Sequence, residues 1–190
     1  MNSVNEKKKR KNRRGHGVRA YLGDFHQTVS GEYVYTGATY SHAPRERSRR
    51  KVMCLLWLYS SVMAVAALIP GCIAAGGMIN CPYVLIPFGG ELISAGSVIW
   101  ALVSLSTNKD PLREYVYTST VEAIPWRSLL TAACAGLAFC GEIVYVLFHR
   151  EEATPGAWLM ILPMAAAAAA ALGNFYVIRA ETWERTEPQC

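Results

Sequence analysis

The feature that most constrains this chain is a long stretch without a charged side chain. Between Lys51 and Glu91 the sequence reads VMCLLWLYSSVMAVAALIPGCIAAGGMINCPYVLIPFGG, with no Asp, Glu, Lys, Arg or His. A helix that crosses the hydrocarbon core of a bilayer needs about 20 mostly apolar residues. The stretch is therefore too long for one crossing and long enough for two, and GGMINCP at 76–82 supplies the turn between them.

The whole chain contains four apolar stretches of spanning length, at about 52–72, 83–105, 128–148 and 157–178. Hydrophobic residues make up 52% of the 190 residues and charged residues only 17%. A soluble protein of this size would have to hide four helices that are apolar on every side. The sequence therefore predicts an all-α integral membrane protein with four transmembrane helices.

The basic residues predict the orientation of these spans, because Lys and Arg near a span are retained in the cytoplasm. Of the nineteen Lys and Arg residues, thirteen precede the first span. Three more lie between spans two and three, and two follow span four, whereas Arg150 alone lies between spans three and four. We therefore expect a multi-pass protein of the cell membrane with both termini in the cytoplasm.

The N-terminal segment 1–30 contains KKKRKNRR and no periodic apolar pattern, so we expect a largely disordered basic arm. Such a cluster is also typical of nucleic-acid binding. A basic cluster just before a first span is, however, what the topology requires, and anionic lipid attracts it by about 1 kcal/mol per Lys or Arg. We therefore expect contact with membrane lipid and not with nucleic acid. The residues expected at the lipid headgroups are Lys7, Lys8, Lys9, Arg10, Arg49, Arg50 and Lys51.

The pentapeptide EYVYT occurs twice, at 32–36 and at 114–118. Each copy is followed by a Pro, an Arg and a Ser, and then by a span with an early Cys, at Cys54 and Cys134. This order suggests a duplication into units 31–105 and 106–190, each a juxtamembrane segment plus a helical hairpin, as in parallel-repeat transporters. Coincidence is the alternative, because spans rich in Ala, Leu and Gly resemble one another. The alternation in EYVYT predicts a short strand on the cytoplasmic side.

Small residues within the spans predict close helix packing, because lipid gives apolar helices no hydrophobic reason to associate. The third span has Gly136 and Cys140, four residues apart, and the fourth has Ala165, Ala169 and Gly173. These stripes are suited to packing within the bundle, to a homo-oligomer, or to a larger membrane-protein partner.

Two ionisable residues lie inside the spans, Glu91 and Glu142. A residue of this kind costs roughly 2.5–3.5 kcal/mol on an insertion scale, so its default interpretation is functional. Counted from the ends of their spans, both lie at similar depth, and two carboxyls in low dielectric tend to share a proton. We expect a proton- or cation-binding pair. The alternative is that each glutamate is protonated, or bonds to a neighbour such as Tyr145 or Ser94.

The segment before Glu91 contains Pro87, Gly89 and Gly90, which predict either an unwound, cavity-lining turn or a simple kink. Cys72 and Cys81 flank the first outer turn, where a disulfide is geometrically possible in an oxidising exterior. The other cysteines and the four histidines are scattered, and we expect no metal site and no cofactor.

The sequence contains no nucleotide-binding loop, catalytic triad or redox motif, so we do not expect an enzyme. The leading expectation is a small membrane protein that acts as an interaction, accessory or assembly subunit. The alternative is a small oligomeric transporter or channel that uses Glu91 and Glu142.

Overall fold

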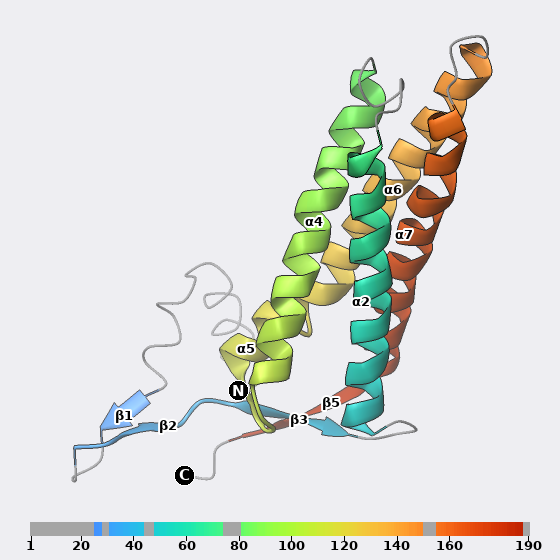
Figure 1. The fold of residues 1–190 in the computed structure, drawn as a ribbon. Coiled ribbons are helices and arrows are strands. Elements are labelled where there is room, and N and C mark those ends of the chain that lie inside the picture. The colour runs from blue at the N-terminus through green and yellow to red at the C-terminus, as the bar shows by residue number, and fades with distance from the viewer. Residues whose placement is uncertain (1–24, 28–30, 44–47, 74–80, 150–154, 188–190) are drawn as a thin grey trace, which may run out of the picture.

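The computed structural model describes residues 25–27, 31–43, 48–73, 81–149 and 155–187. Four long helices run side by side as a bundle, with short strands gathered at one end (Figure 1). We call this end the strand end and the opposite end the far end. The helices are α2 (Arg49–Cys72), α4 (Pro82–Thr107), α6 (Ala123–Phe148) and α7 (Pro155–Ala180). All four are long and apolar enough to cross a membrane, as predicted.

The helices pack in the order α4, α6, α7 and α2 around the bundle, in which α6 contacts both α4 and α7, and α7 contacts both α6 and α2. The contact between α2 and α4, which would close the ring, is the smallest of the four. The arrangement places the first and third helices of the chain diagonally opposite each other. The proposed duplication of two hairpins requires that placement but stays a prediction.

The core of the bundle changes in character along its length. Large side chains such as Leu56, Leu102 and Ile124 fill it near the strand end. The middle is a layer of the buried alanines Ala66, Ala135 and Ala167, which we call the alanine layer. Phe88, Tyr145, Met160 and Met164 fill the far end. Small residues at a helix interface allow the backbones to approach each other closely.

The outward faces of the helices are apolar over most of their length. Ile93 and Trp100 of α4, for example, are 78% and 76% exposed. The hydrocarbon core of a bilayer accommodates such surfaces, whereas water would not. Every Lys and Arg that the structure describes lies toward the strand end of the bundle: Arg49, Arg50, Lys51, Lys109, Arg113, Arg127, Arg179 and Arg185.

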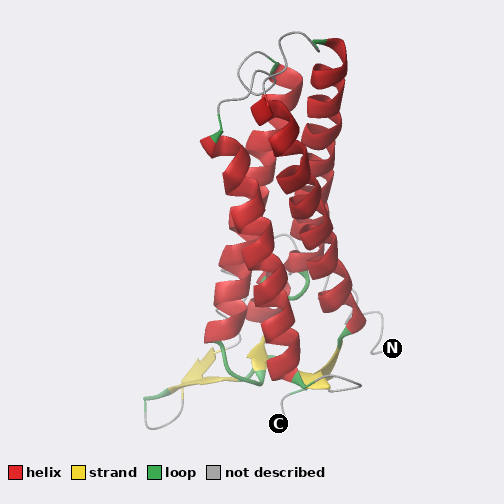
Figure 2. Cartoon of the chain, turned by 45° about the vertical axis from the view of Figure 1, so that its right-hand side comes forward, coloured by secondary structure: helices red, strands yellow, loops and turns green. Residues whose placement is uncertain are grey.

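A three-stranded antiparallel sheet covers the strand end of the bundle (Figure 2). Its central strand is β3 (Thr39–Ala43), which precedes α2. β3 pairs with β4 (Leu112–Arg113), which follows α4, and with β5 (Thr182–Thr186), which follows α7. The sequence interpretation did not predict this sheet, which joins three segments that are far apart in the chain.

Polar and aromatic contacts hold the sheet to the helices. His42 Nε2 lies 3.1 Å from Glu181 Oε2, and both side chains are almost fully buried, at 2% and 5% exposed. The rings of Tyr40 and Tyr117 stack with their centroids 3.9 Å apart, and Trp183 packs edge-on against Tyr117 at 5.9 Å. The guanidinium of Arg49, in the first turn of α2, donates a hydrogen bond of 2.7 Å to the Asn108 carbonyl that follows α4.

The two EYVYT copies adopt different structures. In the first copy, Tyr33–Tyr35 form β2, which pairs with β1 (Phe25–Gln27). The second copy forms the short helix α5 (Glu114–Ser119), so the prediction of a strand is wrong there. Packing explains the difference, because Val116 is buried in the core and Tyr117 stacks on Tyr40, and such contacts override β-propensity.

The copies meet without pairing as strands. The backbone N–H of Glu114 donates to the Tyr35 hydroxyl at 3.3 Å, and that hydroxyl donates to the Ala38 carbonyl at 3.1 Å. The strand at 25–27 also falls within the segment expected to be disordered. The remainder of that arm, with Lys7, Lys8, Lys9 and Arg10, lies outside the described residues.

The small residues predicted to pack have different surroundings. A Cβ atom at Gly173 would lie 2.7 Å from the Tyr59 ring, so this glycine allows α7 to approach α2. A Cβ atom at Gly136, by contrast, would meet nothing within 4 Å. Cys140 and Ala169 are exposed and Ala165 is half-buried. The stripes are therefore only partly used within the chain itself.

The segment around Pro87 is helical throughout, so of the two alternatives given above the unwound turn is not observed. A Cβ atom at Gly90 would lie 3.1 Å from Cys134 Sγ of α6, whereas one at Gly89 would meet nothing within 4 Å. Gly90 thus serves close packing of α4 on α6. Cys72 and Cys81 are free cysteines in the structure, in place of the disulfide considered from the sequence.

Candidate functional site

Glu91 and Glu142, the two glutamates inside the apolar helices, are fully buried, each with 0% of its surface exposed. None of their four carboxyl oxygens has a hydrogen-bond partner among the described residues. Ser94 Oγ, considered above as a partner, instead donates to the backbone carbonyl of Glu91 at 3.0 Å. Burial of an unpaired polar group opposes folding. A contribution to the stability of the bundle therefore does not explain why carboxyls occupy these two buried positions.

The packing of α4 against α6 sets the depths of the two glutamates. The backbone of Gly90 faces Cys134, and the backbone of Gly141 faces Val84. Because α4 and α6 are antiparallel, Glu91 and Glu142 are offset by about eight residues of helical rise, roughly 12 Å along the bundle. The expectation that they lie at one depth does not fit this geometry.

The offset decides how strongly the two groups interact. Two unit charges 12 Å apart interact by roughly 1.4 kcal/mol at an effective dielectric constant of 20, whereas a pair at 4 Å interacts by about 4 kcal/mol. Two carboxyls that share one proton must lie in contact. Glu91 and Glu142 are therefore better described as two separate sites than as a pair.

Glu91 lies at the level of the alanine layer. Gly90, its neighbour in α4, packs against Cys134, and the next residue of α6, Ala135, belongs to that layer. The methyl groups of this layer offer no hydrogen-bond donor and no counter-ion. The carboxyl of Glu91 is the most polar group in the middle of the bundle.

Glu142 lies nearer the far end, where other polar side chains gather. Tyr83 of α4 is 48% exposed, and its ring edge and backbone carbonyl lie beside Gly141, the residue that precedes Glu142 in α6. Tyr145 is 3% exposed, and its ring stacks on the imidazole of His149 with centroids 4.8 Å apart and an interplanar angle of 18°. His149, which follows the last residue of α6, is exposed.

A third set of buried polar groups lies toward the strand end. Asn174 of α7 donates a hydrogen bond of 3.0 Å from Nδ2 to Ser60 Oγ of α2. Asn174 Oδ1 and Ser128 Oγ of α6 are buried without a partner in the described part of the chain. Asn174 and Ser128 each lie seven residues from the alanine layer, or about 10 Å toward the strand end. The sequence interpretation missed this set, although an Asn in an alanine-rich span was the visible signal.

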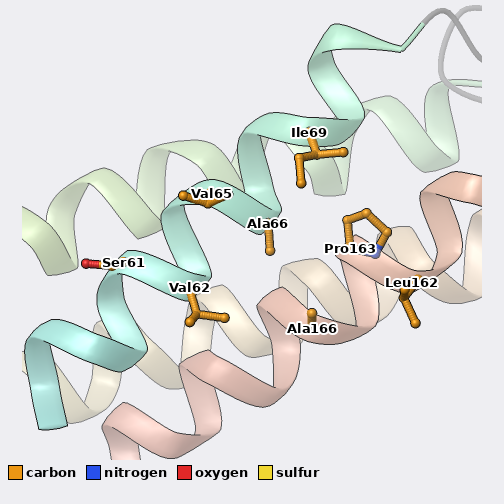
Figure 3. Close-up of a pocket in the computed structure, with 8 residues that line it drawn as sticks. All are labelled: Ser61, Val62, Val65, Ala66, Ile69, Leu162, Pro163 and Ala166. Atoms are coloured by element: carbon orange, nitrogen blue, oxygen red, sulfur yellow. The ribbon is translucent and has the colours of Figure 1, made fainter.

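An apolar groove of about 440 Å³ lies between α2 and α7 (Figure 3). Pro163 and Ala166 of α7 face Val62, Val65, Ala66 and Ile69 of α2 across it. Ser61 is the only polar residue among those that line it. Because it opens on the outer face of the bundle, lipid would contact it in a membrane. None of the residues that line it carries a charge.

Comparisons of the chain with protein-family models, with curated proteins and with solved structures find no match. Within the described ranges, no group of three His, Cys, Asp or Glu side chains is arranged to hold a metal ion.

Proposed function

We propose that this chain is a small multi-pass protein of the cell membrane that binds and transfers a proton or a small cation through Glu91 and Glu142. The observation that carries the proposal is the complete burial of both carboxyls, without partners, among four apolar helices. Ionisable side chains inside a membrane are costly and mark ion or proton pathways.

The positions of the two carboxyls support transfer of a proton or cation along the bundle, and not only binding at one place. Within the described parts of the four long helices, buried polar atoms without a partner occur at three levels, with Glu142 nearest the far end, Glu91 in the middle, and Asn174 with Ser128 toward the strand end. A static structural role would require these groups to satisfy one another, and the unpaired oxygens do not. A bound proton would neutralise each carboxyl in turn.

The distribution of charge supports an orientation with the strand end in the cytoplasm. The described Lys and Arg residues lie toward that end, which agrees with retention of basic residues on the cytoplasmic side. The described segments before α2 and after α7 lie at the same end, as an even number of crossings requires. Both termini are then cytoplasmic.

Reconstitution into liposomes tests the proposal. The purified full-length chain is inserted into vesicles that contain a dye sensitive to the ion under test. Gradients of protons, Na⁺ and K⁺ are then applied separately. We expect flux of one of these ions above that of empty vesicles, and its loss in Glu91→Gln and in Glu142→Gln. Flux that is absent for all three ions, or unchanged in both variants, refutes the proposal.

A second candidate function is an accessory or assembly subunit that binds a larger membrane protein or another copy of the chain. The observation that favours it is the outward exposure of Cys140 and Ala169, together with the open space at Gly136. Small residues on a lipid-facing surface allow another helix to approach closely. Crosslinking in native membranes tests it, because Gly136→Leu should remove a crosslinked species that Gly89→Leu, also at an open glycine, retains.

A further inference from the structure

We infer that two bands of exposed aromatic side chains are the surfaces where this protein meets the two headgroup layers of a lipid bilayer, and that they place Glu91 at the bilayer midplane. This assignment rests on the proposed function for the membrane location, and it adds a depth for each buried carboxyl. The exposed Trp and Tyr side chains of the four long helices lie at two levels. The strand-side band consists of Trp57 of α2, Trp100 of α4, Trp126 of α6 and Tyr176 of α7, and the far band consists of Tyr83 of α4 and Trp158 of α7.

The strand-side band has one member on each helix, and the four members lie at one level. Trp57, Trp126 and Tyr176 are each nine residues from the member of the alanine layer in their own helix. Trp100 is nine residues from Glu91, which lies at the level of that layer. Nine residues of helical rise are about 13–14 Å. The band therefore runs around the bundle at one distance from its middle.

Two hydrogen bonds between helices fix this common level. Arg127 Nη1 of α6 donates to the Ser97 carbonyl of α4 at 2.9 Å. Asn174 Nδ2 of α7 donates to Ser60 Oγ of α2 at 3.0 Å. Each of these four residues lies within three residues of the band member of its own helix. The helices are thus joined in pairs close to the band.

The far band lies at nearly the same distance on the other side of the alanine layer. Tyr83 is eight residues from Glu91, and Trp158 is nine residues from the Ala167 of that layer. Along α4 and α7 the two bands are therefore 17 and 18 residues apart, or about 26–27 Å. The hydrocarbon core of a bilayer is about 30 Å thick, and a few Å less in some membranes. Trp and Tyr are enriched at both of its boundaries, because their rings are apolar and carry one polar group.

The surface between the bands is suited to acyl chains. Among the described residues of the four helices at these levels, those that are exposed carry no charge. Exposed charged side chains begin beyond the strand-side band, at Arg50, Lys51 and Arg179. Arg127, which follows Trp126 in the band itself, is half-buried, and its guanidinium is bonded to a backbone carbonyl. A change from apolar to charged surface at the aromatic level is what a headgroup boundary requires.

The distribution of the strand-side band favours lipid over a partner protein as the group that covers it. The four helices pack in a ring, and each of them exposes one member of the band. A partner protein or a second copy of the chain would cover one side of the bundle. A bilayer surrounds the bundle on every side at one level.

The bands assign different depths to the two glutamates. Glu91 lies midway between Tyr83 and Trp100 in α4, and so at the midplane. Glu142 is seven residues from the alanine layer, or about 10 Å, which places it close to the level of the far band. In secondary transporters the substrate and ion sites lie near the midplane. Glu91 is thus the central site of the bundle, and Glu142 lies near the far boundary.

Depth-dependent quenching of tryptophan fluorescence tests this assignment. Full-length variants that each keep one of the five tryptophans, with the others replaced by Phe, are reconstituted into phosphatidylcholine vesicles. The lipids carry bromine either near the headgroup or near the end of the acyl chain. We expect Trp100 and Trp126 to be quenched more strongly by bromine near the headgroup. Ile93→Trp, in a chain without other tryptophans, should be quenched more strongly by bromine near the chain end, because Ile93 is exposed two residues from Glu91.

Trp183 of β5 is the control, because it lies in the sheet beyond the strand-side band and should be quenched by neither lipid. Trp100, Trp126 and Ile93 are exposed, and Phe in place of Trp183 keeps an aromatic ring against Tyr117. We therefore expect the variants to fold, and size-exclusion chromatography of each variant verifies this.

The outcomes separate this assignment from the proposed function. Quenching of Trp100 and Trp126 that is as deep as that of Ile93→Trp overturns the assignment, because the band then lies within the acyl chains. A lack of quenching of Trp100 and Trp126 by either lipid also overturns it, because water or another protein then covers the band. The expected quenching pattern without any ion flux overturns the proposed transfer alone. Ion flux that depends on Glu91 and Glu142, with a different quenching pattern, overturns the assignment of depth alone.

Discussion

Replacement of Glu91 by Met should stabilise the bundle while it abolishes transfer. A buried polar group without a partner costs about 1–3 kcal/mol. Met is unbranched, of similar length and apolar, so it removes this cost and fills the same space. We therefore expect Glu91→Met to raise the free energy of unfolding by about 1–3 kcal/mol. At about 2–4 °C per kcal/mol for a chain of this size, the midpoint of thermal unfolding rises by about 2–12 °C.

The same reasoning predicts how the two glutamates combine. Because they are offset by roughly 12 Å along the bundle, the double variant with Glu142→Met should equal the sum of the single variants within about 0.5 kcal/mol. Intrinsic tryptophan fluorescence during heating in detergent, at one fixed scan rate, measures the midpoints. Ile93→Met, near Glu91 on the exposed face of α4, is the control and should leave the midpoint unchanged.

Two results would refute this reasoning. A destabilisation by Glu91→Met means that the carboxyl has a bonding partner and holds the bundle together. A coupling energy in the double variant well above 1 kcal/mol means that the two carboxyls interact directly, as a pair that shares a proton would.

Three further predictions concern packing, the sheet and orientation. Gly173→Leu should destabilise the bundle by about 1–3 kcal/mol because its side chain would meet the Tyr59 ring, whereas Gly136→Leu, at an open position, should be neutral in thermal unfolding of the monomer. His42→Leu should destabilise the chain by about 3–5 kcal/mol because it leaves Glu181 buried and unpaired, and the double variant His42→Leu with Glu181→Leu should recover part of that loss in the same assay. In intact cells, a membrane-impermeant maleimide should label the exposed Cys72 at the far end. A cysteine placed at Thr182 of β5, in a chain without other cysteines, should be labelled only after the cells are permeabilised. The reverse pattern contradicts the proposed orientation.

The four helices could be predicted because a helix that is able to cross a bilayer must meet a simple requirement in its sequence. Each span must satisfy its own backbone hydrogen bonds and present apolar side chains, so the sequence contains long segments without a charged residue, such as 52–90. The sheet has no comparable pattern in the sequence. Its strands are short and polar, and the contact between His42 and Glu181 joins residues 139 positions apart. Pairing over that distance has no local pattern in the sequence.

The candidate site could be predicted in part. The cost of a carboxyl in a membrane identified Glu91 and Glu142, and both are buried. Their relative depth depends on how far α4 slides along α6, which contacts at Gly90 and Gly141 determine. Counting from the predicted ends of each span gave the wrong answer because α6 extends beyond the start of α4 at the far end. The sequence contains no information on this offset that could be read before the helices are docked.

The sharing of one strand has a mechanical consequence for the molecule. β3 leads into α2, while β4 and β5 extend from α4 and α7, so three of the four helices are tied to one another at the same end. Any separation of these helices there must first break hydrogen bonds in the sheet. No equivalent tie exists among the described residues at the opposite end. The sheet thus fixes three helices to one another at the strand end, whereas at the far end, where Glu142 is buried, side-chain packing holds the described parts of the helices together.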